Sequence, residues 1–179
     1  DGCRIALDYY LPQARDDAQP PDRLPTIVIF TPYYRRFVTT DPTVEASPNC
    51  GRYRDFFVPH GYAVVVVDVR GTGASFGTRD ALRSPKERDD YHEIAEWIVQ
   101  QPWSDGRVGM YGGSYTGFAQ WAAAKRLPPA LKTIVPYVAN NPGDGLPMEN
   151  NVFLFVNYAW AFYTTNNKTL DNAQAGTTS

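Results

Sequence analysis

The stretch GRVGMYGGSYTGFAQWAAAKR, residues 106–126, decides the expected fold, because it places a serine where a strand-like run gives way to a helical pattern. RVGMYG, residues 107–112, is a short run with the character of a buried strand. YTGFAQWAAAKR, residues 115–126, repeats apolar residues with a helical period. Ser114 is therefore expected at a sharp strand-to-helix turn, and the glycines around it leave room for tight packing.

A serine at such a turn is a candidate nucleophile. Its hydroxyl is weakly nucleophilic at neutral pH and needs activation. The turn pushes the hydroxyl clear of the backbone, and the helix that begins there points N–H groups at any negative charge that develops. A serine between glycines also occurs in ordinary turns, so this interpretation depends on the rest of the chain.

Other apolar runs support an α/β fold. RIALDYYLP, residues 4–12, is typical of an edge strand, whereas TIVIFT, residues 26–31, and LKTIVPYVA, residues 131–139, predict further strands. YAVVVVDVRG, residues 62–71, lacks alternation, which indicates a strand covered on both faces. Strands that alternate with helices predict a mostly parallel sheet flanked by helices.

A helix is predicted to begin at Ser84, with Pro85 in its first turn and Glu87 as a capping-box glutamate. An apolar stripe then recurs at helical spacing, through Tyr91, Ile94, Ala95 and Ile98. Past residue 140 the pattern weakens, and VFLFVNYAWAFYTT, residues 152–165, is interpreted as a helix.

The composition excludes several classes of function. The net charge of −2 gives no reason to expect nucleic acid or an anionic membrane as a partner. No apolar run reaches the roughly 18 residues that a membrane span needs, and the first residues lack a signal-peptide pattern, so the compartment stays open. Cys3 and Cys50 are expected to be unpaired, and neither spacing resembles a metal site. No cofactor or metal is expected, and the oligomeric state stays open.

The turn at Ser114 resembles the nucleophile elbow of α/β-hydrolases, G-x-S-x-G, with one departure. Thr116 occupies the place of the second glycine, and Gly117 follows it. This variant resembles the cocaine-esterase and X-Pro dipeptidyl-peptidase family of serine hydrolases. That family also includes acylases and α-amino-acid ester hydrolases that process β-lactams.

Further segments carry the same resemblance in the family's order: DGCRIALDYYLP (1–12), TPYYRR (31–36), VVVDVRGTGASFG (65–77) and WSDGRVGMYGGSYTGFAQW (103–121). The likeness covers residues 1–139 and implies the N-terminal part of an α/β-hydrolase core. Residues 140–179 are then expected to begin a helical cap insertion.

The resemblance implies a role for each matching residue. Ser114 would be the acyl-forming nucleophile, the backbone N–H of Tyr115 one oxyanion donor, and the Tyr33 hydroxyl the other, with the neighbouring Tyr34 as the alternative. The implied function is a serine acyl hydrolase that cleaves an ester or amide, of peptide or β-lactam side-chain type, in a small-molecule or short-peptide substrate. The alternative is a non-catalytic or inactive protein on a truncated α/β-hydrolase fold.

Both histidines, His60 and His92, precede Ser114, whereas α/β-hydrolases place their histidine after the serine and the acid. The catalytic Asp and His are therefore expected downstream of residue 179, with Asp144 as a weak early candidate for the acid. This segment by itself is expected to be inactive. His60 is expected to pair with carbonyls at a helix end, and His92 to lie on a solvated helix face.

The segment GTGASFG, residues 71–77, could be mistaken for a dinucleotide-binding loop, but its glycines break the G-x-G-x-x-G spacing. Asp68 and Arg70 are expected to brace this loop rather than to act on substrate.

Overall fold

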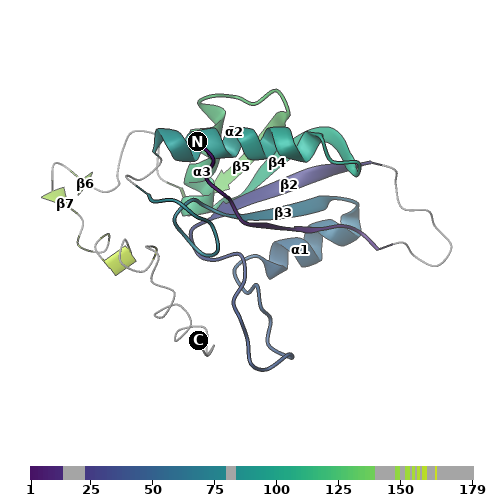
Figure 1. Cartoon of the computed structure of the whole chain (residues 1–179), viewed down its shortest axis with the longest axis horizontal. Coiled ribbons are helices and arrows are strands. Elements are labelled where there is room, and N and C mark those ends of the chain that lie inside the picture. The colour runs from purple at the N-terminus through teal and green to yellow at the C-terminus, as the bar shows by residue number, and fades with distance from the viewer. Residues whose placement is uncertain are drawn as a thin grey trace.

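The computed structural model describes residues 1–13, 23–79 and 84–139 and, further along the chain, residues 148, 149, 152, 153, 155, 157, 159, 160 and 164. Within these residues, the elements in chain order are β1 (Leu7–Tyr10), β2 (Leu24–Thr31), α1 (Gly51–Phe57), the 3₁₀ helix η1 (Val58–His60), β3 (Ala63–Asp68), α2 (Pro85–Val99), β4 (Ser104–Gly113), α3 (Tyr115–Ala124), β5 (Leu131–Tyr137), β6 (Met148–Glu149) and β7 (Val152–Phe153). Figure 1 shows their arrangement.

One sheet with the strand order β1-β3-β2-β4-β5 forms the centre of the molecule. The strands β3, β2, β4 and β5 pair in parallel, whereas β1 pairs with β3 antiparallel at the edge of the sheet. The predicted mostly parallel sheet and the edge strand near the start of the chain are both confirmed. Because β2 and β4 are parallel neighbours, the residues that follow them emerge at the same edge of the sheet.

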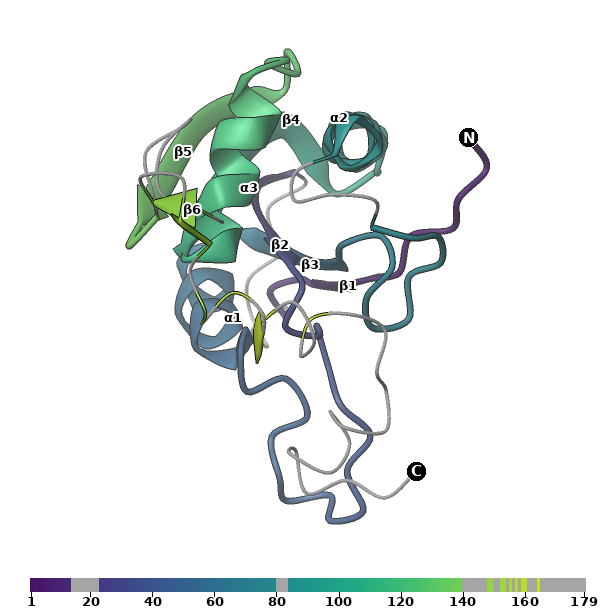
Figure 2. The ribbon, with the colours of Figure 1, turned by 90° about the vertical axis from the view of Figure 1, so that its left-hand side faces the viewer.

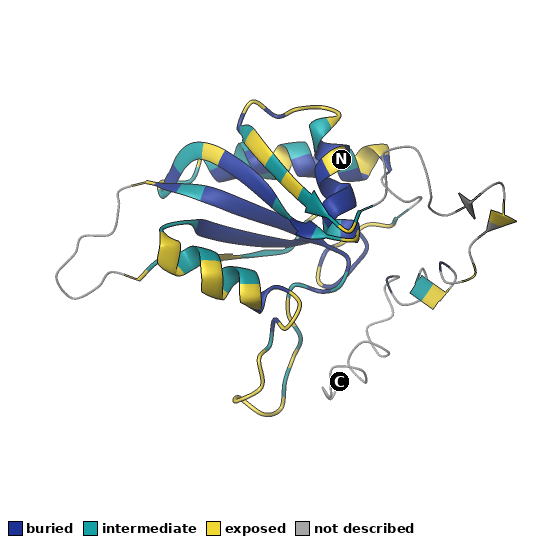
Figure 3. Ribbon diagram, turned by 180° about the vertical axis from the view of Figure 1, so that it is seen from behind, coloured by how far each residue is buried: buried dark blue, intermediate teal, exposed yellow. Residues whose placement is uncertain are grey.

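The apolar run in β3 is explained by packing on both faces of the sheet. Val65 and Val67 belong to a core with residues of α2 and α3, whereas Val64 and Val66 belong to a second core with residues of α1. Figure 2 shows α2 and α3 on one face of the sheet and α1 on the other, and Figure 3 shows the central strands buried between them. Successive residues of a strand point to opposite faces, so a strand between two layers is apolar throughout.

The start of α2 confirms the predicted cap, with one correction. Ser84 Oγ accepts the backbone N–H of Glu87 at 3.2 Å, and Pro85 occupies the first helical position. The capping-box assignment of the Glu87 side chain is wrong, because its carboxylate is fully buried and accepts the hydroxyls of Tyr91 and Tyr115. Both phenols donate to Oε1 of this carboxylate, so the Glu87 side chain is directed into the core rather than back to the helix end.

Residues 152–165 also differ from the prediction at their start. Val152–Phe153 forms the short strand β7, which pairs antiparallel with β6 instead of beginning a helix. Residues 157, 159, 160 and 164 are helical, and the rest of the proposed cap lies outside the described residues. The two cysteines are free thiols, as expected. Among the described helices, none has the length and apolarity that a membrane crossing requires.

Candidate active site

Ser114 stands alone between β4 and α3 in a backbone conformation that side chains rarely adopt. Its φ is 53° and its ψ −125°, a conformation that costs about 1–3 kcal/mol and persists where surrounding contacts enforce it. Those contacts are present, since its N–H donates to the carbonyls of Tyr137 and Val138, each at 3.2 Å. Its own carbonyl accepts the N–H groups of Gly117 at 2.9 Å and Phe118 at 3.0 Å, which begins the helix. The predicted sharp turn is therefore present.

The departure from G-x-S-x-G has a steric explanation. A Cβ on Gly112, whose φ is 150°, would lie 2.1 Å from Thr116 Oγ1, so the missing side chain at 112 makes room for the threonine. Thr116 Oγ1 in turn donates to the carbonyl of Gly113 at 2.7 Å. A Cβ on Gly117 would lie 2.8 Å from that of Ala139, so the displaced glycine is the one that meets the segment after β5.

Gln120 supports the turn from inside α3, a role that its place in an apolar helix pattern did not reveal. The side chain is fully buried. Its Nε2 donates to the carbonyls of Gly112 at 3.2 Å, Thr116 at 3.0 Å and Val135 at 3.4 Å. One amide therefore ties the end of β4, the first turn of α3 and β5 together.

Tyr33 reaches the turn from the neighbouring strand end. Its hydroxyl lies 3.3 Å from Ser114 Oγ. Its backbone is held on both sides, because its N–H donates to Thr31 Oγ1 at 2.9 Å and its carbonyl accepts Asn49 Nδ2 at 2.5 Å. Tyr34 is buried, with a positive φ of 66°. Of the two tyrosines, Tyr33 is the one whose hydroxyl the structure brings to Ser114.

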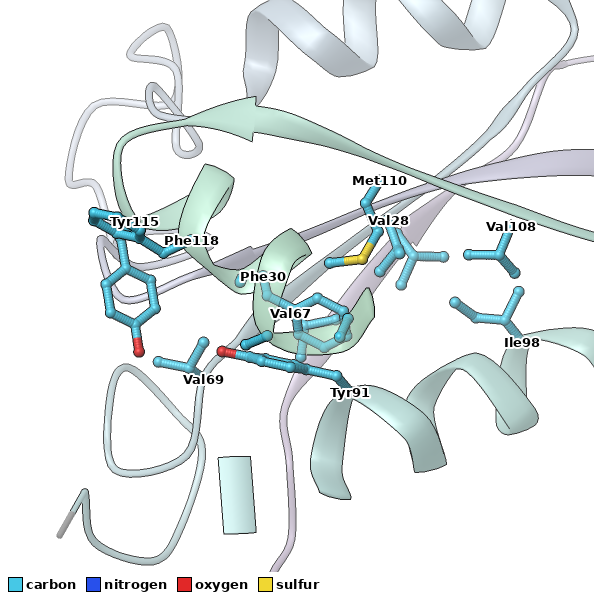
Figure 4. Close-up of a cluster of buried hydrophobic side chains, with 14 of the residues drawn as sticks. Val28, Phe30, Val67, Val69, Tyr91, Ile98, Val108, Met110, Tyr115 and Phe118 are labelled. Atoms are coloured by element: carbon cyan, nitrogen blue, oxygen red, sulfur yellow. The ribbon is translucent and has the colours of Figure 1, made fainter. Parts of the chain in front are cut away.

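Tyr115 is a buried residue that begins α3 and has its side chain fixed in the core. Among the described residues, no acceptor pairs with its backbone N–H, which lies in the first turn of α3. Its phenol is buried and donates to Glu87, as does that of Tyr91. Figure 4 shows the two hydroxyls directed toward each other. Burial, reinforced by the adjacent carboxylate, raises the pKa of the Tyr115 phenol well above its ordinary value, so the phenol stays protonated.

Two residues that the sequence did not point to also lie at this site. The indole ring of Trp160 stacks on the phenol ring of Tyr115, with ring centroids 5.7 Å apart. The Trp160 Nε1 donates to the Tyr33 hydroxyl at 3.3 Å. The Arg79 guanidinium lies 5.0 Å from the Tyr115 ring centroid and 5.5 Å from that of Trp160. Neither residue belongs to a recognisable motif, so only the fold reveals them.

Asp68 braces the loops at this edge of the sheet, as predicted. Its carboxylate accepts the backbone N–H of Arg35 at 2.6 Å, the guanidinium of Arg35 at 2.8 Å and the backbone N–H of Ala74 at 3.1 Å. Burial raises the pKa of this carboxyl, although the hydrogen bonds oppose the shift. Arg70 similarly braces its loop through a bidentate pair with Asp90, at 2.8 and 2.6 Å.

The histidines do not join the site. His60 Nδ1 lies 2.6 Å from the Phe56 carbonyl, in agreement with the expected helix-end contact. His92 is half-buried rather than fully solvated, and its Nδ1 is shielded from solvent. Neither has a hydrogen bond to Ser114 among the described contacts. Asp144 lies outside the described residues, which contain no group of His, Cys, Asp and Glu able to hold a metal ion.

Comparison with known proteins decides the family. Residues 1–178 match the family described as X-Pro dipeptidyl-peptidase (S15 family). The chain belongs to the X-Pro dipeptidyl-peptidase S15 family. A Mycobacterium bovis protein provisionally named serine esterase is 41% identical over 144 residues, 76% of this chain and 22% of its own length. The cocaine esterase of a Rhodococcus species is 36% identical over 158 residues, 83% of this chain and 25% of the esterase.

A solved structure of a hydrolase shares the fold. The crystal structure of a CocE/NonD family hydrolase from Staphylococcus aureus matches with a TM-score of 0.58 and 30% identity, over 74% of this chain and 24% of that one. The chain thus has the α/β-hydrolase fold and belongs to a family of hydrolases. It spans about a quarter of the length of the curated S15 relatives it matches, as the esterase comparison shows.

Proposed function

We propose that the complete protein containing this chain is a serine acyl hydrolase with Ser114 as its nucleophile. The observation that carries the proposal is the 3.3 Å approach of the Tyr33 hydroxyl to Ser114 Oγ at a strained turn. Backbone strain of this kind clusters at active sites, and a hydroxyl donor beside the serine, from the loop after β2, is suited to stabilise the oxyanion of acyl transfer. Membership of a hydrolase family supports the same reaction class.

In the proposed reaction, Ser114 Oγ bonds to the substrate carbonyl carbon as a base removes the hydroxyl proton. The carbonyl oxygen becomes an oxyanion that accepts hydrogen bonds from the Tyr115 backbone N–H and the Tyr33 hydroxyl. Collapse of this intermediate breaks the bond to the alcohol or amine, which leaves with a proton, and an acyl-serine remains. Water then attacks the acyl-serine and releases the acid.

The base and its orienting acid are proposed to come from outside residues 1–179. Both histidines of the chain precede Ser114, and His60 Nδ1 is engaged by the Phe56 carbonyl. This assignment follows the α/β-hydrolase order of serine, acid and histidine. The proposed substrates are small esters or amides, including short peptides and β-lactam side-chain amides.

We propose as well that residues 140–179 begin a helical cap over an α/β core of residues 1–139. The contact of Trp160 with the Tyr33 hydroxyl and the Tyr115 ring supports this assignment, since it brings a residue from this region to the nucleophile. A cap in this position would contribute to the pocket for the acyl group.

The test is active-site labelling of the complete protein with a fluorophosphonate probe. The probe is expected to modify Ser114, as located by mass spectrometry of the labelled peptide. Ser114→Ala should abolish both labelling and turnover of an activated ester. The matched control is Ser104→Ala, at a buried serine of β4 away from the turn. Turnover that survives Ser114→Ala would overturn the assignment, and a folded wild-type protein without labelling or turnover would favour a non-catalytic member of the family.

A further inference from the structure

The hydroxyl of Tyr33 has a second partner besides Ser114. The indole N–H of Trp160 donates to the Tyr33 hydroxyl oxygen at 3.3 Å. The same oxygen lies 3.3 Å from Ser114 Oγ. The three groups thus form a short chain from residue 160 to the nucleophile.

The chemistry of the three groups gives this chain a direction. An indole N–H can only donate, whereas a phenol has one hydrogen and can both donate and accept. The bond from Trp160 therefore uses an acceptor position of the Tyr33 oxygen and leaves the phenolic hydrogen to point elsewhere. Ser114 Oγ is its partner among the described contacts. If Tyr33 donates to that oxygen, the serine hydrogen is left for a base.

We infer that Trp160 is a positioning residue that directs the Tyr33 hydroxyl hydrogen toward the nucleophile and the developing oxyanion. The inference rests on the proposed function, because it assigns a role relative to the proposed oxyanion donor. An accepted hydrogen bond also polarises the phenol and strengthens the bond that it donates. Trp160 thereby acts on turnover through Tyr33.

Arg79 and Tyr115 hold the indole in place. The Trp160 and Tyr115 rings are stacked with an angle of 24° between their planes, and the Arg79 guanidinium lies over both rings. Arg79 Nη1 also donates to Thr164 Oγ1 at 3.4 Å, and that hydroxyl donates to the Trp160 carbonyl at 3.0 Å. A cation is attracted to an aromatic face, so Arg79 joins Trp160 and Thr164 to the turn.

The test is a double-substitution cycle in the complete protein, with Trp160→Phe, Tyr33→Phe and both together, assayed on an activated ester. Trp160→Phe keeps a ring against Tyr115 but removes the N–H donor. It is expected to lower kcat about 3- to 10-fold, the effect of one neutral hydrogen bond, with KM nearly unchanged. In the Tyr33→Phe background the same substitution should change kcat by about twofold or less, because there is no hydroxyl left to direct.

A second readout separates positioning from packing. A boronic acid that forms a tetrahedral adduct with serine should bind more weakly to Trp160→Phe, and Trp160→His, which restores a ring N–H, should recover part of the loss. Equal losses of kcat in both Tyr33 backgrounds would overturn the inference, because Trp160 would then act by packing alone. If Trp160→Phe does not fold, Trp160→His and Trp160→Leu replace it in the cycle. A Tyr33→Phe variant with normal turnover would instead refute the proposed oxyanion donor, which distinguishes the two failures.

Discussion

Replacing Gly112 by alanine should destabilise the complete protein, because the turn at Ser114 has no room for a Cβ there. The new atom would lie 2.1 Å from Thr116 Oγ1 and 2.7 Å from Thr116 Cβ, at a φ of 150°. Displacing Thr116 from its rotamer, breaking its 2.7 Å bond to the Gly113 carbonyl and imposing the backbone strain together cost about 2–6 kcal/mol.

Guanidinium chloride unfolding measures this change, and Thr116→Gly provides the control. Thr116→Gly removes the clash but not the backbone strain, so Gly112→Ala should cost less in its presence. The expected coupling energy between the two positions is about 1 kcal/mol or more. A Gly112→Ala variant within about 0.5 kcal/mol of wild type would refute the steric explanation, since that is the range of neutral surface changes. Strictly additive effects would refute it as well.

Three further predictions concern the nucleophile, a buried thiol and the isolated chain. Tyr33→Phe in the complete protein should lower kcat about 100- to 1000-fold, the usual effect of one lost oxyanion donor. Ser114 should still react with a fluorophosphonate. Loss of turnover in Tyr34→Phe but not in Tyr33→Phe would reassign the donor. Burial raises the pKa of the Cys50 thiol to about 12, so maleimide at pH 8 should label the half-buried Cys3 before Cys50. Labelling of Cys50 should increase only as the pH rises or the protein unfolds. Rapid labelling of Cys50 in the folded protein would contradict this prediction. Purified residues 1–179 should show negligible ester hydrolysis, and turnover that is lost on Ser114→Ala would show that His60 or His92 supplies the base.

Local patterns predicted the framework of this molecule well. The unbroken apolar run of β3 implied layers on both faces, because each of its valines had to be buried on one side or the other. The cap at Ser84 depends on residues within one helical turn, so a short stretch of sequence encodes it. The glycines beside Ser114 signalled the turn there, although the Tyr137 and Val138 carbonyls that hold it come from a distant strand end.

Contacts between distant residues were beyond such patterns. The backbone spacing of Ser84 and Glu87 suggested a capping box, but the Glu87 carboxylate binds Tyr115, 28 residues away. The partner of the Tyr33 hydroxyl, Trp160, lies 127 residues further along the chain. No local propensity distinguishes either side chain from an ordinary helix residue. The assignment of Tyr33 rather than Tyr34 came from the family resemblance.

The carboxylate of Asp68 has a consequence for protein engineering. It binds Arg35, in the loop after β2, and Ala74, in the loop after β3. The first of these loops carries Tyr33 and the second carries Arg79. Both residues contact Trp160. A chimera that transplants either loop alone from a relative would separate it from its shared anchor. The two loops are therefore best exchanged together, as one cassette with Asp68 between them.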